Sequence, residues 1–485
     1  MNRREYIRRK ILEHLIGPTG SILLHILILY LAVHFIVFET RDTTPEIEVR
    51  VMEIETPDLD DLDLDFEPEL EPLEFDLDFD MDVDMDVDMD VPPEDMDFTQ
   101  DQPDVDFAAL DVMQVESPLI MQGLFSGRNE AGRSALLREY GGRWGEQTAQ
   151  AVMRALEWLR INQNEDGSWA HGGPSSAMTG LGLLTFLAHG ETTSSERYGH
   201  TVRRAIRFLM EQQRGDGRFR NTGGSHVYGN AIAAYALTEA YALTRIPRVR
   251  ESMNKAIQAM IDHQQPAGGW DYEFRQGDRR DTSVSAFIVQ ALKAAELAES
   301  DAEGIQRCMD LALEDLRSVF NANHGSFGYT SVIRERNDRA LSMTAIGTLL
   351  FQLTGHGRSP EARAGADFVR DMATMDWDEP TRWALYRNYY ITQVMFQSGG
   401  GAWQSWNNQF APQFVRNQNE DGSWTSPSAQ LEGGAGREGT YGPVYATTFA
   451  ALSLQVYYRI LPTFAVVDEP EPEEDPDDDV VIQII

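Results

Sequence analysis

Two kinds of hydrophobic pattern alternate along most of the chain from residue 146 onward. In the segment 151–163, AVMRALEWLRINQ, apolar residues recur three or four positions apart with charges on the opposite face, which predicts an amphipathic helix. In the segments 176–190 and 230–244 most positions are apolar, which predicts helices that are buried on all sides. Six helices of each kind alternate, so the pattern predicts an inner ring of helices within an outer ring.

A turn of similar sequence comes after each amphipathic helix, and six such turns recur at intervals of 47 to 57 residues. Repetition at a regular interval is typical of a repeat architecture, and closing the repeats into a ring hides both of its open edges. The sequence therefore predicts an all-α fold, an α6/α6 toroid of six helical hairpins, over residues 117–462. The turns are QNEDGSW (163–169), QRGDGRF (213–219), QQPAGGW (264–270), NANHGSF (321–327), DMATMDW (371–377) and QNEDGSW (418–424), and they end at Trp169, Phe219, Trp270, Phe327, Trp377 and Trp424.

The motif Gln-x-x-Asp-Gly-Ser-Trp, at 163–169 and 418–424, resembles the QW motif of squalene and terpene cyclases and of protein prenyltransferase β-subunits. The resemblance covers about residues 117–462 and implies the α6/α6 toroid of those proteins. It also implies an architectural role for the motif, in which the glutamine hydrogen-bonds nearby backbone groups and the aromatic ring packs into the next groove.

The same resemblance draws attention to Asp278-Arg279-Arg280-Asp281-Thr282, which opens a predicted inner helix. Class II terpene cyclases carry Asp-x-Asp-Asp-Thr at this place, and the middle aspartate donates a proton to the substrate. Here the middle position is Arg280, which stays protonated and cannot act as a general acid. A second stretch, Asp376-Trp377-Asp378-Glu379, has its tryptophan in register with the turn aromatics, which favours a surface turn. The catalytic candidates are Asp281, Asp376 and Asp378.

The sequence offers no metal site or cofactor site. A single cysteine, Cys308, excludes intrachain disulfides and multi-cysteine zinc or iron–sulfur sites. It lies in a predicted outer helix and lacks the Asp-x-Cys spacing of the prenyltransferase zinc site. Thioester domains with this toroid carry Gly-Cys-Gly-Glu-Gln, whereas residues 143–147 have Trp144 in place of the thiol. We therefore expect no cofactor and no metal.

Polar and aromatic residues at the starts of the inner helices are candidates for lining a cavity. Buried tyrosine and histidine side chains usually satisfy hydrogen bonds within a core, although an aromatic-lined cavity can also hold a lipid-like or sugar ligand. The candidate ligand-binding residues are His171, His226, Tyr228, Arg280, Asp281, Tyr389 and Tyr441, together with Tyr390 and Tyr445.

Residues 20–38, GSILLHILILYLAVHFIVF, form an uncharged apolar run that is long enough for a transmembrane helix. A basic segment precedes it and an acidic one comes after it, so the positive-inside rule predicts a single-pass inner-membrane anchor with residues 1–19 cytoplasmic and the toroid in the periplasm. Ser21 and His25 lie four residues apart on one face, a pattern that resembles the anchor of TonB-type energy transducers. The resemblance implies docking against a proton-driven motor of the ExbB/ExbD kind; a histidine tolerated in a plain anchor is the alternative.

The net negative charge of the chain comes from two segments, because residues 46–116 and 468–479 account for the whole formal net charge of −37. Self-repulsion predicts a disordered spacer over residues 39–116, with loose calcium binding or pairing with a partner's sheet edge as alternatives. The tail 463–485 is predicted to be acidic up to VVIQII (480–485), which can add a strand to the sheet edge of a partner. No basic patch comes after the N-terminal segment, so we expect no nucleic-acid partner.

These observations together favour a membrane-anchored periplasmic toroid that is a binding or scaffold protein without catalytic activity, coupled to a TonB/ExbB/ExbD-like motor. The main reason is that Arg280 replaces the acid on which a cyclase reaction depends. Two alternatives remain from a different functional class. One is a terpene-cyclase-like enzyme acting on an isoprenoid lipid, and the other is a polysaccharide-active enzyme that uses Arg279, Arg280 and Asp281.

Overall fold

The computed structural model describes residues 130–169, 175–222, 226–277, 279–431 and 442–458, which belong to one compact unit. The predicted anchor, spacer and acidic tail lie outside the described residues, as do the candidates Ser21, His25, His171 and Tyr441. Among the described residues, no helix has the length and the apolar composition needed to cross a membrane.

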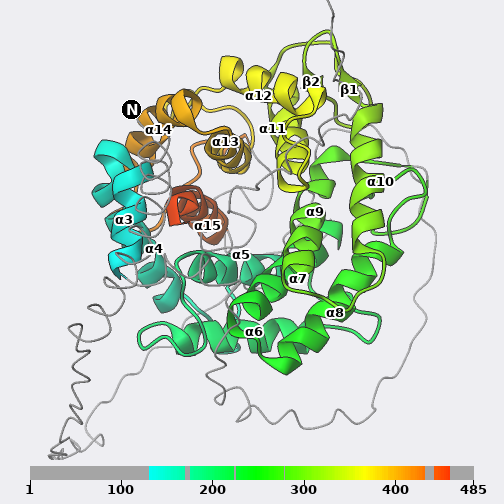
Figure 1. Cartoon of the computed structure of the whole chain (residues 1–485). Coiled ribbons are helices and arrows are strands. Elements are labelled where there is room, and N and C mark those ends of the chain that lie inside the picture. Colours follow the sequence, from blue (N-terminus) through cyan, green and yellow to red (C-terminus); the bar gives the residue numbers. More distant parts are fainter. Residues whose placement is uncertain (1–129, 170–174, 223–225, 278, 432–441, 459–485) are drawn as a thin grey trace, which may run out of the picture. The chain divides into compact units, whose positions relative to one another are not determined.

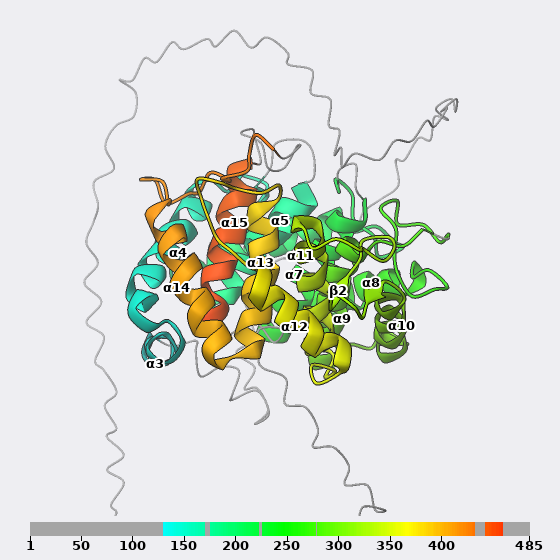
Figure 2. The ribbon, with the colours of Figure 1, turned by 90° about the horizontal axis from the view of Figure 1, so that it is seen from above.

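Outer and inner helices alternate along the described part of the chain and form two concentric layers (Figure 1). In the perpendicular view the helices lie roughly parallel or antiparallel to one another (Figure 2). The outer helices are α4 (Gly145–Ile161), α6 (Gly199–Gln212), α8 (Pro247–Asp262), α10 (Ile305–Ser318), α12 (Pro360–Met372) and α14 (Gly400–Arg416). The inner helices are α5 (Ser175–Ala188), α7 (His226–Thr244), α9 (Thr282–Leu297), α11 (Asp338–Leu353), α13 (Ala384–Ser398) and α15 (Gly442–Leu454).

The ring of inner helices is closed. Each inner helix contacts the next one in the chain, and α15 returns to contact α5, while α14 contacts α4 in the outer ring. Every residue of α5 is buried, as expected for a helix enclosed on all sides. In α4 the buried apolar residues form one stripe, Val152, Ala155, Leu156 and Leu159. The predicted all-α toroid is therefore confirmed.

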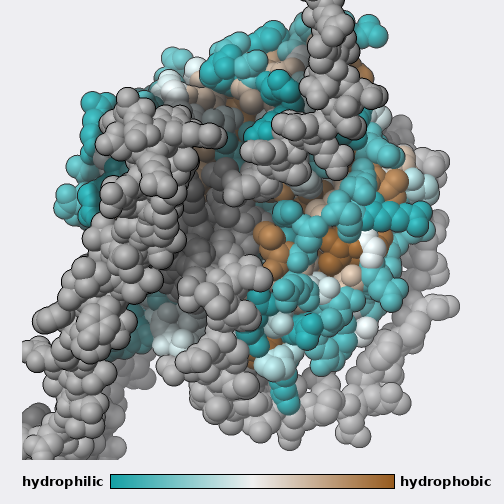
Figure 3. All heavy atoms as spheres, viewed as in Figure 1, coloured by the Kyte–Doolittle hydropathy of each residue, from teal (hydrophilic) through white to brown (hydrophobic). Residues whose placement is uncertain are grey.

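The outer helices expose their polar faces to solvent. In the space-filling view, hydrophilic residues cover the rim formed by α8, α10 and α12, and hydrophobic residues are visible between them (Figure 3). In α10 the residues Ile305, Cys308, Met309, Ala312 and Leu316 are buried. The pattern of apolar positions thus decides which side of each outer helix faces the inner ring.

The glutamine of the repeated turn joins consecutive hairpins. Gln163 donates from Nε2 to the carbonyl oxygen of Gly167 in its own turn (3.0 Å) and to that of Thr201 in α6 (3.0 Å). The same pair of bonds recurs from Gln213 to α8, from Gln264 to α10 and, closing the ring, from Gln418 to α4. Each such glutamine therefore satisfies one carbonyl of its own turn and one of the next outer helix.

Two of the six turns, 321–327 and 371–377, lack this glutamine. At 321–327 the glutamine is missing, and β1 (Phe320–Asn321) pairs antiparallel with β2 (Ser326–Phe327). At 371–377 there is no glycine, and the Trp377 ring packs edge-on against Phe414 of α14, with centroids 5.5 Å apart. The remaining described elements are α3 (Glu130–Tyr140), η3 (Gly142–Trp144) and η5 (Val456–Tyr458), with α3 in contact with η5.

Candidate active site

Asp281 is fully buried at the start of inner helix α9. It is the N-cap residue, with extended backbone, and its Oδ1 accepts a hydrogen bond from the backbone N–H of Ser283 (2.9 Å). The Ser283 hydroxyl donates a second bond to the same oxygen (2.6 Å). An aspartate is a preferred N-cap residue because its side chain satisfies a free N–H of the first turn. Capping therefore fixes the carboxyl group at the N-terminal end of α9.

Four tyrosine side chains from other elements surround this carboxyl and Ser283. Tyr228 of α7 donates its hydroxyl to Ser283 Oγ (2.7 Å), and Tyr386 of α13 donates to the Ser283 carbonyl (3.1 Å). The Tyr272 hydroxyl lies 3.3 Å from Ser283 Oγ and 2.7 Å from the hydroxyl of Tyr329. We call Asp281, Ser283, Tyr228, Tyr272, Tyr329 and Tyr386 the Asp281 cluster. Because α7, α9 and α13 all contribute to it, the cluster lies where the N-terminal ends of the inner helices meet.

Burial raises the pKa of Asp281, although the hydrogen bonds from Ser283 and Tyr329 and the charge of Arg279 act in the opposite direction. Burial also raises the pKa values of Tyr228, Tyr272 and Tyr386, so these phenols stay neutral. Among the described residues, Oδ2 of Asp281 has no hydrogen-bond partner of normal geometry. Burial therefore shifts Asp281 toward its neutral form, while two hydrogen bonds hold Oδ1 in place.

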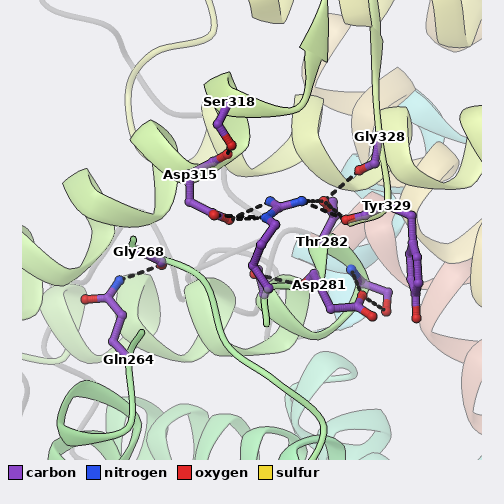
Figure 4. Close-up of polar contacts among 11 residues, drawn as sticks. Gln264, Gly268, Asp281, Thr282, Asp315, Ser318, Gly328 and Tyr329 are labelled. Atoms are coloured by element: carbon purple, nitrogen blue, oxygen red, sulfur yellow. Dashed lines mark hydrogen bonds and ion pairs between the residues drawn. The ribbon is translucent and has the colours of Figure 1, made fainter. Parts of the chain in front are cut away.

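Arg280 points away from the cluster, contrary to the expectation that it takes the place of a catalytic acid. Its Nε lies 2.9 Å from Oδ1 of Asp315 in outer helix α10, and its Nη2 lies 2.5 Å from Oδ2. Figure 4 shows Asp315 on one side of this segment and Asp281 with the Tyr329 ring on the other. The guanidinium is paired with Asp315. It is therefore not free to bind an acidic polysaccharide, which weakens the alternative of a polysaccharide-active enzyme.

A layer of aromatic rings packs next to the cluster. Tyr390 lies edge-on to Tyr386, with ring centroids 4.9 Å apart, and Tyr389 lies edge-on to Tyr390 at 5.0 Å. Phe449 of α15 contacts Tyr386 at 5.9 Å, and the Tyr445 ring is 4.8 Å from Phe449. The predicted residues Tyr389, Tyr390 and Tyr445 are thus buried in this layer. The layer adjoins the cluster through Tyr386.

The described candidates His226, Asp376 and Asp378 are not part of the cluster, and His171 and Tyr441 lie outside the described residues. His226 is exposed at the start of α7, where its Nδ1 lies 3.0 Å from Thr222 Oγ1. Asp376 and Asp378 are exposed, and Asp376 Oδ1 accepts the backbone N–H of Asp378 (2.9 Å), so this stretch is the surface turn that its register favours. Of the predicted residues, only Tyr228 and Asp281 belong to the Asp281 cluster.

Four members of the cluster, Ser283, Tyr272, Tyr329 and Tyr386, were not among the predicted site residues. A signal for two of them is present in the repeats, because Tyr272 lies two positions after Trp270 and Tyr329 lies two positions after Phe327. The same position after Trp169 is His171, which was selected because it comes just before a predicted inner helix. Placing all six turns in register would have identified Tyr272 and Tyr329 together.

The described residues contain no group of three or more His, Cys, Asp or Glu side chains that could hold a metal ion. Cys308 is buried in α10, and burial raises the pKa of its thiol to about 12, so it stays protonated. A buried neutral thiol is a poor nucleophile and a poor metal ligand.

No family model and no curated protein sequence matches the chain. Several solved structures are similar in fold. A sugar epimerase from a ruminal bacterium has a TM-score of 0.50 at 12% identity, covering 65% of this chain and 98% of that one. Cellobiose 2-epimerase from Spirochaeta thermophila has a TM-score of 0.48 at 13% identity, with 68% and 99% covered. A type II terpene cyclase from Scytonema has a TM-score of 0.46 at 13% identity, with 65% and 98% covered.

The likeness to the sugar epimerase, at a TM-score of 0.50, shows an α/α toroid, and that neighbour is an enzyme. The predictions of a non-catalytic scaffold and of a chain that is not an enzyme are therefore contradicted. The error arose from the interpretation of one residue, Arg280. From its place in the sequence motif, Arg280 was expected to occupy the position of the acid, whereas the fold directs Arg280 to α10 and buries the carboxyl of Asp281 among tyrosines instead.

Proposed function

We propose that this protein is an enzyme in which Asp281 is the general acid, acting on the carbon–carbon double bond of an isoprenoid lipid. The observation that carries the proposal is a fully buried carboxyl group, with its pKa raised by burial, surrounded by neutral phenol rings. A carboxylic acid that is kept neutral by its surroundings can donate a proton near neutral pH. The described part of the chain offers no second carboxyl group in the cluster.

Proton transfer would use the two oxygens of Asp281 differently. Oδ2 gives its proton to one carbon of the double bond, whose π electrons form the new C–H bond and leave a cation on the other carbon. The carboxylate that remains is stabilised by the Ser283 N–H and hydroxyl on Oδ1. Attack by a second double bond moves the cation. The last cation then loses a proton that returns to the Asp281 carboxylate, which restores the acid and completes an isomerisation without change in composition.

The surroundings suit a cationic intermediate. The faces of Tyr386, Tyr390 and Phe449 are electron-rich and attract a cation by several tenths of a kcal/mol to about 2 kcal/mol each. Tyr390 and Phe449 are buried, and their burial keeps water from the cation, which would otherwise be captured as an alcohol. The phenol hydroxyls are held in hydrogen bonds with Ser283 and with each other, so they are poor competitors for the acidic proton.

The sequence supports a lipid as the substrate class. The apolar run 20–38 is long enough to anchor the chain in a membrane, which is where isoprenoid lipids are found. We propose an inner-membrane location with the toroid on the periplasmic side, because the basic residues precede this run. An anchor of this kind tethers the enzyme to the membrane that holds its proposed substrate.

The experiment compares full-length wild-type protein with Asp281→Asn in vesicles that contain unsaturated isoprenoids of different length, with product analysis by gas chromatography and mass spectrometry. We expect cyclised isomers from wild type and a loss of about 10²- to 10⁴-fold in kcat for Asp281→Asn. Asparagine keeps the cap acceptor but has no acidic proton. Asp376→Asn, at the exposed turn, is the matched control and should keep full activity. Equal turnover by wild type and Asp281→Asn would contradict the proposal.

A further inference from the structure

Arg280 and Asp315 form a buried ion pair between the segment before α9 and outer helix α10. Their side chains are only 10% and 3% exposed, and the guanidinium approaches both carboxylate oxygens. Two-point contacts of this kind fix the orientation of both groups as well as their distance. The pair therefore sets the direction in which the chain enters α9.

The other edge of the guanidinium holds the segment that carries Tyr329. Nη1 of Arg280 donates to the carbonyl oxygen of Tyr329 (2.7 Å) and lies 3.1 Å from Thr282 Oγ1. Thr282 adds bonds from its N–H to the Tyr329 carbonyl (3.1 Å) and from its hydroxyl to the Gly328 carbonyl (2.7 Å). Figure 4 shows the Tyr329 ring extending from this backbone to the side of Asp281. The backbone at 328–329 is thus tied to the first residues of α9.

The turn 264–270 makes room for the ion pair at one position. A Cβ atom on Gly269 would lie 2.9 Å from Asp315 Oδ2 and 3.0 Å from Arg280 Cβ. The two QNEDGSW turns have Ser168 and Ser423 at the equivalent place. The glycine that distinguishes this turn therefore lies directly against the ion pair that distinguishes this segment.

We propose that Arg280 is a positioning residue, whose ion pair with Asp315 clamps the Gly328–Tyr329 backbone so that Tyr329 stays beside Asp281 and water is kept from that carboxyl. The proposal rests on the proposed role of Asp281 as general acid. Arg280 itself does not transfer the proton; it acts through Tyr329. The titratable and charged groups that face Asp281 are Arg279, Tyr228 of α7, Tyr272, Tyr329 and Tyr386 of α13.

Removing the Arg280–Asp315 ion pair should change the pKa of Asp281 more than it changes the stability of the fold. Burial is the largest cause of the raised pKa of Asp281, and it outweighs the opposing hydrogen bond from Tyr329. If the 328–329 segment moves away, water reaches the carboxyl, and the gain in solvation exceeds the loss of that hydrogen bond. The pKa of Asp281 should then fall toward the ordinary value of a carboxyl group.

The test uses the double variant Arg280→Gln/Asp315→Asn in the full chain, because removing both charges leaves no unpaired buried ion. Carboxyl carbon NMR gives the pKa of Asp281, and urea unfolding confirms the fold. We expect a lower pKa, a fall in kcat of about 100-fold and an unchanged KM. Arg280→Lys, which keeps the charge but offers one donor group, should give intermediate values. Gly269→Ala, which pushes the pair apart and leaves both charges, should act in the same direction.

The matched control is Arg317→Gln/Glu361→Gln, which removes another ion pair of α10 (3.4 Å) away from Tyr329 and should leave the pKa and kcat unchanged. A pKa of Asp281 that is unchanged or higher in a folded Arg280→Gln/Asp315→Asn protein would overturn the clamp. An ordinary pKa of Asp281 in the wild-type protein would instead overturn the proposed general acid, so the two failures can be told apart without a substrate.

Discussion

Two turns of the toroid share their internal hydrogen bonds and differ in the segments that they lead into. In the turn 418–424, Gln418 bonds the Gly422 carbonyl (2.8 Å) and the Trp424 indole donates to the Phe414 carbonyl (2.9 Å). In the turn 264–270, Gln264 bonds the Gly268 carbonyl (2.8 Å) and the Trp270 indole donates to the Met260 carbonyl (2.9 Å). Of these two turns, the second leads into a buried carboxyl group, at Asp281.

The comparison separates architecture from chemistry. The contacts that repeat from turn to turn join one hairpin to the next, and their hydrogen bonds have the same lengths in the two turns. The contacts that do not repeat, the ion pair of Arg280 with Asp315 and the capping of α9 by Asp281, lie at one point of the ring. In a repeat protein the site is therefore best sought where a unit breaks the common pattern while its framework stays intact.

The largest expected effect concerns the shared framework. Trp424→Ala and Trp270→Ala should each lower the free energy of unfolding by about 3–5 kcal/mol, because each removes a fully buried ring and its hydrogen bond. Urea unfolding, monitored by circular dichroism, measures both. Losses that differ by more than about 2 kcal/mol would disprove the equivalence of the two turns. Ile161→Ala, on an exposed side chain of α4, is the control and should change little.

A smaller effect is expected from the glutamines. Gln418→Ala leaves the carbonyls of Gly422 and Ala151 without this donor, and Gln264→Ala does the same for Gly268 and Cys308. Each change should cost about 1–3 kcal/mol, again measured by urea unfolding. Gln258→Ala, whose amide bonds an exposed carboxylate, is the control. If only Gln418→Ala lowers the free energy of unfolding strongly, the two turns are not equivalent. Such a result would indicate that closure of the ring makes unfolding cooperative.

The smallest expected effect is a pH dependence of stability that has opposite signs in the two regions. The pKa of Asp281 is raised in the folded protein, so the folded state keeps a proton that the unfolded state has lost above pH about 4. The stability contributed by this group is present below that pH and is lost as the pH rises through the raised pKa. Asp281→Asn removes the titration, so its stability relative to wild type should increase over this window.

Urea unfolding of both proteins at a series of pH values measures this relative stability. Asp421→Asn makes the same chemical change within the turn 418–424, where hydrogen bonds from Ser423 outweigh desolvation and hold the pKa of Asp421 below its usual range. The sign should therefore be opposite there: the wild-type stability from Asp421 is present above pH about 4 and is lost at lower pH. Parallel curves for wild type and Asp281→Asn would contradict the burial of a titrating carboxyl.

Much of the fold could be predicted from the sequence because the information is local and repeated. The apolar stripe of α4, the all-round burial of α5 and the Gln-to-aromatic turns each predict their own environment, and six copies reinforce one another. The site was harder to predict. Asp281 and Tyr228 were recognised as candidates, but Tyr272, Tyr329 and Tyr386 come from three separate segments that only the ring brings together.

The alternation of outer and inner helices and the period of the ring are encoded locally, because side-chain hydrophobicity acts on each helix wherever it lies. The protonation state of Asp281 and the direction of the Arg280 side chain depend instead on packing against residues that are distant in the sequence. A carboxyl group loses its charge when the residues around it exclude water, and an arginine turns outward when a carboxylate on another helix binds it there. Both effects require partners distant in the chain: Asp315 is 35 residues from Arg280 and Tyr386 is 103 from Ser283.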